Sequence, residues 1–291
     1  KQKTAYEMLR SLVGSEMCIR DRLYPIPPMA DTQGRTEEII GTWFKKNSNR
    51  EKVILATKVA GRSLMNWFRG GETRLDRSNI EEALNNSLKR LQTDYVDLYQ
   101  LHWPDRRIAM FGSGGIGYKH IEAESIAISE TLEVLGDLVK SGKVRHVGLS
   151  NETSWGLSEF LKYSEKEDLP RVASVQNAYN FLNRTYEDAL SEFHYQSEVG
   201  LLAYSPIAQG YLSGKYIDGA RPEGSRTALF KRGDRYEVPG ANEAIKSYVA
   251  YANKIGMDPS VFANAFVNLS LIHISEPTRL LSISYAVFCL K

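Results

Sequence analysis

The sequence has two cysteines, Cys18 and Cys289, and none in the long stretch between them. A disulfide framework is therefore not expected, and the cysteines place little constraint on the redox compartment. No run of about 18 or more apolar residues occurs, so we expect no membrane-spanning helix. The sequence also begins without the basic-then-apolar pattern that is typical of a signal peptide.

An excess of one charge sign is also missing, because 37 Lys and Arg residues face 35 Asp and Glu residues. This balance gives no attraction to nucleic acid or to an acidic membrane surface, so neither is expected as a partner. The 291 residues are 42% hydrophobic and 25% charged. That length and composition are typical of a globular protein with a sizeable core, in one large domain or two ordinary ones.

What the sequence does have, from about Leu23, is a regular alternation of strand and helix patterns. Short apolar runs typical of buried strands lie at 52–60, 95–103, 144–151, 172–180 and 199–207. Amphipathic helices are predicted at 36–46, 78–92, 129–143, 153–165, 185–198, 242–255 and 259–267. We expect Thr36 to cap the first helix, and Ser78 with Glu81 to form a capping box on the second. The alternation predicts an α/β fold with a parallel sheet, either a closed barrel or an open doubly wound sheet.

Polar side chains end several of the predicted strands, and in a parallel sheet these ends meet at one edge. They are Lys58, His102, Ser150, Asn151, Gln176, Asn177, Tyr204 and Ser205. Taken singly, a strand-end lysine is most often a solvated residue, and a histidine is most often a hydrogen-bonded one. Their occurrence together at one edge predicts a functional site.

Several segments in order resemble the aldo-keto reductases, in particular bacterial members related to the potassium-channel β subunit. The segments are LYPIPP, ADTQGRTEE, REKVILATKV, SLKRLQTDYVDLYQLHWPD, SGKVRHVGLSNET, VQNAYNFLNR and LLAYSPIAQGYLSGKY. The resemblance covers about residues 23–268. It implies a (β/α)8 TIM barrel that reduces aldehydes and ketones to alcohols with NADPH, in the cytoplasm, and it leaves the oligomeric state open.

The resemblance implies that Tyr24, Lys58 and His102 are catalytic. Tyr24 would donate the proton that the developing alkoxide needs after hydride transfer. A free tyrosine has a pKa of about 10, which is too high for an acid near neutrality, and a nearby ammonium lowers it. His102 would hydrogen-bond the carbonyl oxygen of the substrate and orient it.

The resemblance also implies a set of cofactor contacts for NADP(H). Ser150, Asn151 and Gln176 would hold the nicotinamide carboxamide, and Tyr204 would stack on the ring. The loop that surrounds the pyrophosphate would contribute Ser205, Pro206, Ile207, Gln209 and Lys215, with Arg226 as a weaker phosphate match. Trp103 would line the substrate pocket, although a packed strand-end aromatic is an equally good interpretation. No metal site is indicated.

The two ends of the sequence depart from the family. Ile19 stands where the family has the aspartate that precedes the tyrosine, and Asp21 is out of register. KQKTAYE, LVGSEMCIRD, LSLIHISEPTR and ISYAVFCLK resemble translated sequencing-adapter DNA. We therefore expect residues 1–22 and 269–291 to be foreign to a partial barrel at 23–268. That barrel would lack its first strand, most of its second and its eighth, so we expect poor stability and weak turnover.

Two other interpretations bear on function. GSGGIG at 112–117 matches a dinucleotide-binding pattern, but it does not lie between a buried strand and a helix, so a loop over the site is expected.

A β-subunit-like module that binds NADPH and a partner, without significant turnover, is the alternative to an enzyme. In that branch the histidine position is commonly an asparagine, so His102 favours the enzyme.

Overall fold

The protein is represented by a computed structural model, which describes residues 16–18, 29–63, 65, 67, 69–108, 121–230 and 234–269. The chain divides into two units, Lys1–Gln176 and Asn177–Lys291. Within the described ranges, no helix combines the length and the apolar composition that crossing a bilayer requires.

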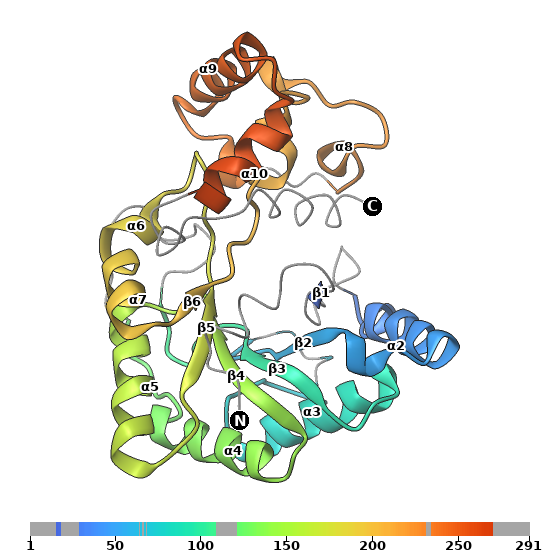
Figure 1. Cartoon of the computed structure of the whole chain (residues 1–291), viewed down its shortest axis with the longest axis vertical. Helices are drawn as coiled ribbons and strands as arrows, with labels where there is room; N and C mark the ends of the chain where they lie inside the picture. Colours follow the sequence, from blue (N-terminus) through green and yellow to red (C-terminus); the bar gives the residue numbers. More distant parts are fainter. Residues whose placement is uncertain are drawn as a thin grey trace. The chain divides into compact units, whose positions relative to one another are not determined.

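The first unit contains a parallel sheet with helices along its outer side (Figure 1). Its strands β1 (Glu16–Cys18), β2 (Ile54–Val59), β3 (Val96–Leu101), β4 (Val144–Ser150) and β5 (Val172–Gln176) lie in this order, each parallel to the next. Its helices are α2 (Arg35–Asn47), α3 (Arg77–Leu91), α4 (Ile128–Lys140) and α5 (Ser154–Glu167), and a short 3₁₀ turn covers Arg50–Lys52. From β2 to β5 every strand is followed or preceded by a helix, so the predicted parallel α/β arrangement is confirmed.

Helix α3 buries the apolar face that the sequence pattern predicts. Ile80, Leu84 and Leu91 are fully buried, and each such side chain stabilises the fold by about 2 kcal/mol. The hydroxyl of Tyr99 on β3 donates to the Ile80 carbonyl, which anchors this helix to the sheet. Burial of this apolar face therefore holds α3 against the sheet.

The predicted helix caps are wrong in two places. Asp76 caps α3 by accepting from the Asn79 N–H at 2.9 Å, and Ser78 lies inside the helix and donates to Asp76. Asp is at least as good a cap as Ser, and it stands where the chain turns into the helix. Helix α2 begins after Gly34, which has no side chain that could cap the helix, and Thr36 lies within the first turn.

Strand β1 lies in the segment that we predict to be foreign to the body of the chain. Its residues pair in parallel with β2, Glu16 with Ile54 and Cys18 with Ala56. Ladder hydrogen bonds join backbone groups only, so any extended segment can form them. The pairing therefore does not bear on the origin of residues 1–22, which stays a prediction.

The second unit is mostly helical, and two predictions about it need correction. Its elements are α6 (Thr185–Ala189), α7 (Ser191–Ser197), β6 (Gly200–Leu201), α8 (Arg226–Phe230), α9 (Ala241–Lys254), α10 (Pro259–Leu269) and the 3₁₀ turns Ala208–Ser213, Ile217–Gly219 and Asp234–Tyr236. The predicted helix at 185–198 breaks at Leu190, where φ is −101°. The predicted strand at 199–207 has two residues, Gly200–Leu201, and its predicted far end is excluded because Ser205 is left-handed (φ 57°) and Pro206 has no N–H to donate.

Aromatic side chains form the core of the second unit. The Phe181 ring stacks on Tyr248, Phe262 and Phe266, with ring centroids 4.3, 5.0 and 4.0 Å away. Buried Tyr211, Leu212, Tyr216, Tyr236 and Ile245 pack together beside them. These contacts join α9 and α10 to the loop that follows β6, so the shape of that loop depends on this core.

The stability of the second unit should fall at acid pH because of His194. Burial lowers the pKa of His194 to about 4, whereas the unfolded chain takes up this proton near pH 6.5. The unfolded state therefore binds more protons between these values, and stability falls as the pH is lowered through that window, by about 2 kcal/mol between pH 7 and pH 5.

Urea unfolding at both pH values, on the unchanged chain and on His194→Gln, measures this effect. His194→Gln should show about 2 kcal/mol less pH dependence. An equal loss of stability in the two chains would show that His194 is not responsible.

Candidate functional site

Lys58 lies on the inner face of the sheet, opposite the helices. Its neighbour Thr57 donates to Glu37 of α2 at 2.7 Å, so Thr57 faces the helices. Successive side chains of a strand point to opposite faces, and Lys58 therefore faces inward, where it is 3% exposed. The ladder places it in one row with Gln100, Gly148 and Ser174.

A second row of polar residues lies next to this one, toward the carboxyl ends of the strands. Ser150 pairs with Gln176, and the register of β3 with β4, continued by one residue, places His102 beside Ser150. His102 is tied to β2 because its N–H donates to the Val59 carbonyl at 2.9 Å. The structure thus brings Lys58, His102, Ser150 and Gln176 to one face, with Lys58 one layer deeper.

Asn151 holds the ends of three strands together. Its N–H donates to the Gln176 carbonyl at 3.0 Å, and its Nδ2 donates to the His102 carbonyl at 2.9 Å and to the Ser150 hydroxyl at 3.2 Å. The Ser150 hydroxyl in turn donates to the Gln176 carbonyl at 2.7 Å. Asn151 has φ 53°, a left-handed conformation that asparagine tolerates better than most residues.

One buried acceptor in this group is available to a ligand. The side-chain oxygen of Gln176 is buried and has no hydrogen-bond partner among the described residues. Leaving such a group unpaired costs about 1–3 kcal/mol. A ligand that offers an N–H donor, such as a carboxamide, would remove that cost.

Trp103 packs against the strand ends rather than standing in an open cavity. It is 4% exposed, its indole N–H donates to the Arg62 carbonyl at 2.8 Å, and its ring lies 4.3 Å from the His102 ring. Gly61 allows this packing, because a Cβ at that position would lie 2.3 Å from the Trp103 carbonyl oxygen. Trp103 therefore supports His102 from the side.

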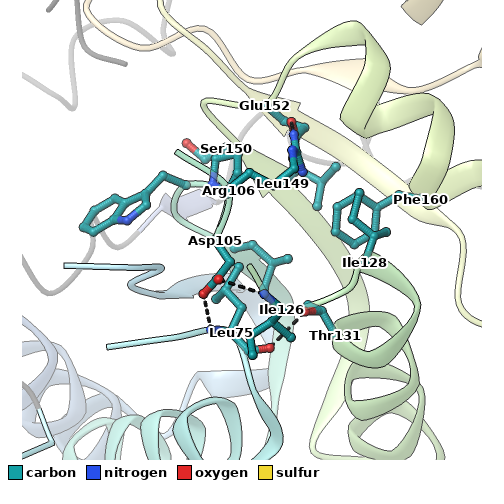
Figure 2. Close-up of a pocket in the computed structure, with 13 residues that line it drawn as sticks. Leu75, Asp105, Arg106, Ile126, Ile128, Thr131, Leu149, Ser150, Glu152 and Phe160 are labelled. Carbon is teal, nitrogen blue, oxygen red and sulfur yellow. Dashed lines mark hydrogen bonds and ion pairs between the residues drawn. The ribbon is translucent and has the colours of Figure 1, made fainter. Parts of the chain in front are cut away.

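Figure 2 shows the small cavity beside these strand ends. Its volume is about 10 Å³, enough for about one water molecule. Asp105 accepts from the N–H groups of Leu75 and Ile126 at 3.0 and 2.9 Å, and so holds two loops at this end of the sheet. Arg74 neutralises Asp105 at 3.0 Å. The cavity is a packing defect between loops and has no room for a carbonyl substrate.

A buried ion pair stands on the other side of the same cavity (Figure 2). Glu152 accepts from Arg106 at 2.6 Å and from the Thr153 N–H at 2.7 Å. Burial raises the pKa of Glu152, although Arg106 opposes the shift. Gly156 leaves space for the pair, because a Cβ there would lie 2.1 Å from the carboxylate. The pair fixes the chain that follows Ser150 and Asn151.

In the second unit, the loop after β6 has an unusual backbone. Ser205, Ala208 and Gln209 have φ of 57°, 48° and 58°, and Gly210 has 102°. Left-handed non-glycine residues cluster at ligand-binding segments, because their strain persists only where the surroundings hold it. A change from negative φ at Ile207 to positive φ at Ala208 is the backbone form of an anion-binding nest.

Two basic residues of the predicted set lie near this loop. The Lys215 side chain covers Gly210, where a Cβ would lie 3.3 Å from Nζ, and Nζ is 5.2 Å from the Tyr216 ring centroid. Arg226 begins α8, and its Nε is buried without a hydrogen-bond partner in the described part of the chain. The neighbours of Arg226, Ser225 and Thr227, lie beside the Tyr216 hydroxyl, which has no hydrogen-bond partner among the described residues. Tyr216 thus lies beside both segments that carry the two cations.

A larger cavity of about 280 Å³ lies within the second unit. It is lined by Phe181, Leu182, Arg235, Tyr236, Val238, Pro239, Ala241, Ala244 and Tyr248. Arg235 on its wall lies beside the hydroxyls of Tyr204 and Tyr236. One wall residue of the cavity is therefore next to Tyr204, the residue predicted to stack on the nicotinamide.

Some predicted features lie outside the described residues. They are the catalytic Tyr24, the departures at Ile19 and Asp21, and the GSGGIG segment at 112–117. The described members of the catalytic set, Lys58 and His102, are both on the inner face of the first unit. The residues predicted to contact the cofactor phosphates, from Ser205 to Lys215 together with Arg226, all lie in the second unit.

Comparisons with known proteins address the identity of the chain. The aldo/keto reductase family matches residues 23–281. Protein tas of Escherichia coli (strain K12) is 45% identical over 248 residues, 84% of this chain and 71% of that protein. An aldo-keto reductase of Babesia bovis is 40% identical over 209 residues, 68% of this chain and 73% of that protein. The chain belongs to the aldo/keto reductase family.

The family accounts for the fold and for the coarse activity. Aldo/keto reductases are oxidoreductases with a (β/α)8 barrel, and the parallel strands and helices of the first unit are part of one, so the predicted barrel fold is confirmed. A Schizosaccharomyces pombe protein described as a candidate β subunit of a voltage-gated potassium channel is 28% identical over 265 residues, 86% of this chain and 70% of that protein. The predicted relation to that branch is therefore confirmed as well.

Sequence reasoning missed several residues that shape the site. Gln100 and Ser174 are fully buried polar residues in the Lys58 row, and a polar residue inside an apolar strand run was the signal for each. Asp105, Arg106 and Glu152 follow strand ends, as the predicted residues do, but their partners lie far away in the sequence. Pattern alone therefore could not pair them.

Removing one partner of the Arg106–Glu152 pair should destabilise the first unit strongly. Arg106→Met leaves the Glu152 carboxylate buried without its cation, which costs about 3 kcal/mol. Adding Glu152→Gln removes the charge and should restore most of that loss. Urea unfolding of the two variants measures both effects.

Arg77→Met is the matched control, because its pairs with Glu81 and Asp137 are exposed and are worth less than about 1 kcal/mol. Equal losses for Arg77→Met and Arg106→Met would contradict the assignment.

Proposed function

We propose that the protein is an NADP(H)-dependent, cytoplasmic aldo-keto reductase that reduces the carbonyl group of a small aldehyde or ketone to an alcohol. The observation that carries the proposal is the pair of polar rows on the inner face of the first unit. Lys58 lies in the deeper row, and His102, Ser150 and Gln176 lie at the strand ends. Family membership supports the roles that the resemblance implies for these positions.

The proposed chemistry needs three side chains of this chain. His102 would donate a hydrogen bond to the carbonyl oxygen and hold it in place, as donors aimed at developing negative charge do. Tyr24 would give its proton to that oxygen. A Lys58 ammonium near the Tyr24 hydroxyl would favour the phenolate and so make Tyr24 a better acid near neutral pH. Bound NADPH would supply the hydride.

The residues present are suited to hold NADP(H). The unpaired Gln176 oxygen can accept from the carboxamide N–H, and Ser150 and Asn151 lie beside it. In the second unit, the left-handed turn at Ala208 and the Lys215 ammonium offer donors and positive charge for phosphate oxygens. Arg226 adds an unpaired guanidinium nitrogen.

A partner module without turnover is the second candidate, because one relative carries a channel-subunit description. His102 favours the enzyme. The expected weak turnover of the chain as written stays a prediction. Binding of NADPH without any reduction of aldehydes would favour the partner module, and an absence of NADPH binding would contradict both.

NADPH binding is tested by titration, with the quenching of protein fluorescence as the readout. The unchanged chain should bind NADPH, and Gln176→Ala and Lys215→Met should each weaken binding about tenfold, because each removes a hydrogen bond or charge worth about 1.5 kcal/mol. Lys246→Met is the control, since Lys246 is half-exposed and pairs with Asp218. Equal affinities in all four chains would show that the assigned contacts are wrong.

The catalytic roles are tested by the rate of NADPH oxidation with an aromatic aldehyde. Tyr24→Phe should lower the rate by about 100-fold or more, because it removes the proton donor. It should leave the NADPH affinity nearly unchanged. Lys58→Met should also suppress turnover.

Tyr195→Phe is the control, because Tyr195 is 62% exposed. Persistent turnover in Tyr24→Phe would exclude Tyr24 as the acid, and a near-normal rate in Lys58→Met would exclude the lysine.

A further inference from the structure

Asn180 is a fully buried polar residue in the second unit that no predicted role uses. Its Nδ2 donates to the Ser205 carbonyl at 2.9 Å and to the Tyr236 hydroxyl at 3.0 Å. Its Oδ1 accepts from the N–H groups of Leu182 and Asn183 at 2.9 and 3.0 Å. Both donors and both acceptor positions of the amide are therefore occupied.

The bonds of Asn180 belong to a closed circuit around Tyr204 and Ser205. Arg235 lies beside the hydroxyls of Tyr236 and Tyr204, where its positive charge opposes the rise in their pKa values that burial causes. The Tyr204 backbone pairs with Asn177 and Tyr179 through bonds of 3.0 and 3.4 Å. The circuit thus fixes the Tyr204 side chain at one end and the Ser205 carbonyl at the other.

The circuit holds a backbone that would otherwise relax. Ser205 is left-handed, a conformation that is strained for a residue with a Cβ. Asn180 holds the Ser205 carbonyl. The direction of this carbonyl fixes how the loop from Ser205 to Gln209 begins. Buried, fully satisfied networks of this kind rigidify the groups they join.

From this geometry we infer that Asn180 and Arg235 are positioning residues for cofactor binding: Asn180 holds the Ser205 backbone and Arg235 holds the Tyr204 ring, so that a nicotinamide ring meets a preformed surface. The inference rests on the proposed function, since it assigns the ring contact to Tyr204. Preorganised contacts bind more tightly because less ordering is left to binding.

The test uses two variants of the full chain that disturb the circuit at different points. Asn180→Asp keeps the acceptor bonds of the turn and loses the donors to Ser205 and Tyr236. Arg235→Lys keeps the positive charge and loses the planar fork that joins two hydroxyls. If Asn180→Asp does not fold, which thermal unfolding shows, Arg235→Lys carries the test, because Arg235 is partly exposed.

Each variant has a matched control in the same unit. Asn183→Asp makes the same chemical change in the same turn, where the side chain bonds only Thr185. Arg184→Lys makes the same change at an exposed arginine that pairs with Glu187. Neither residue contacts Tyr204 or Ser205 in the circuit described above, so both controls should behave as the unchanged chain.

The readouts are the NADPH dissociation constant and the emission of bound NADPH at saturation. Reduced nicotinamide emission depends on the shielding of the ring from water, so it reports the ring surface itself. We expect about tenfold weaker binding and an emission closer to that of free NADPH in both variants. Unchanged affinity and emission in the variants, with binding by the unchanged chain, would overturn the inference alone. No NADPH binding by the unchanged chain would overturn the proposed function and the inference together.

Discussion

The register of the parallel ladder from β2 to β5 decides which side chains of the first unit face inward. A slip of one residue would exchange the two faces, moving Lys58 toward the helices and Thr57 inward. Two side-chain bonds oppose that slip: Thr57 to Glu37 of α2, and Tyr99 to the Ile80 carbonyl of α3. The rows that contain Lys58 and His102 are thus a consequence of how the helices are bonded to the outer face.

Buried charges serve different purposes at the two ends of this sheet. At the amino end of β3, Asp97 pairs with Arg50 and Arg145 at 2.8 and 2.7 Å, and both guanidinium groups lie about 4 Å from the Tyr95 ring centroid. At the carboxyl end, Asp105 and Glu152 hold the loops beside His102 and Ser150. The first group closes the base of the sheet, and the second keeps the strand ends in position for chemistry. This division is the one that barrel enzymes share.

The second unit depends on strain that is held in place by hydrogen bonds. Three non-glycine residues between Ser205 and Gln209 are left-handed, and Asn180, Tyr236 and Arg235 surround the beginning of that loop. The aromatic core of Phe181 and Tyr248 keeps the supporting segments together. Strained backbone of this kind clusters at ligand-binding segments, so the proposed cofactor contacts and the inferred circuit belong to one argument.

The amino-acid sequence by itself determined the order of strands and helices, the apolar face of α3 and the family, because periodicity and local motifs are properties of neighbouring residues. It also located Lys58, His102, Ser150 and Gln176, since strand ends can be read from apolar runs. The caps at Asp76 and Gly34, the break at Leu190 and the two-residue length of β6 depended on backbone angles that the pattern does not encode. Only the tertiary structure paired Arg106 with Glu152 and joined Asn180 to Ser205 and Tyr236, because those partners lie far apart in the chain and meet only when the core has packed.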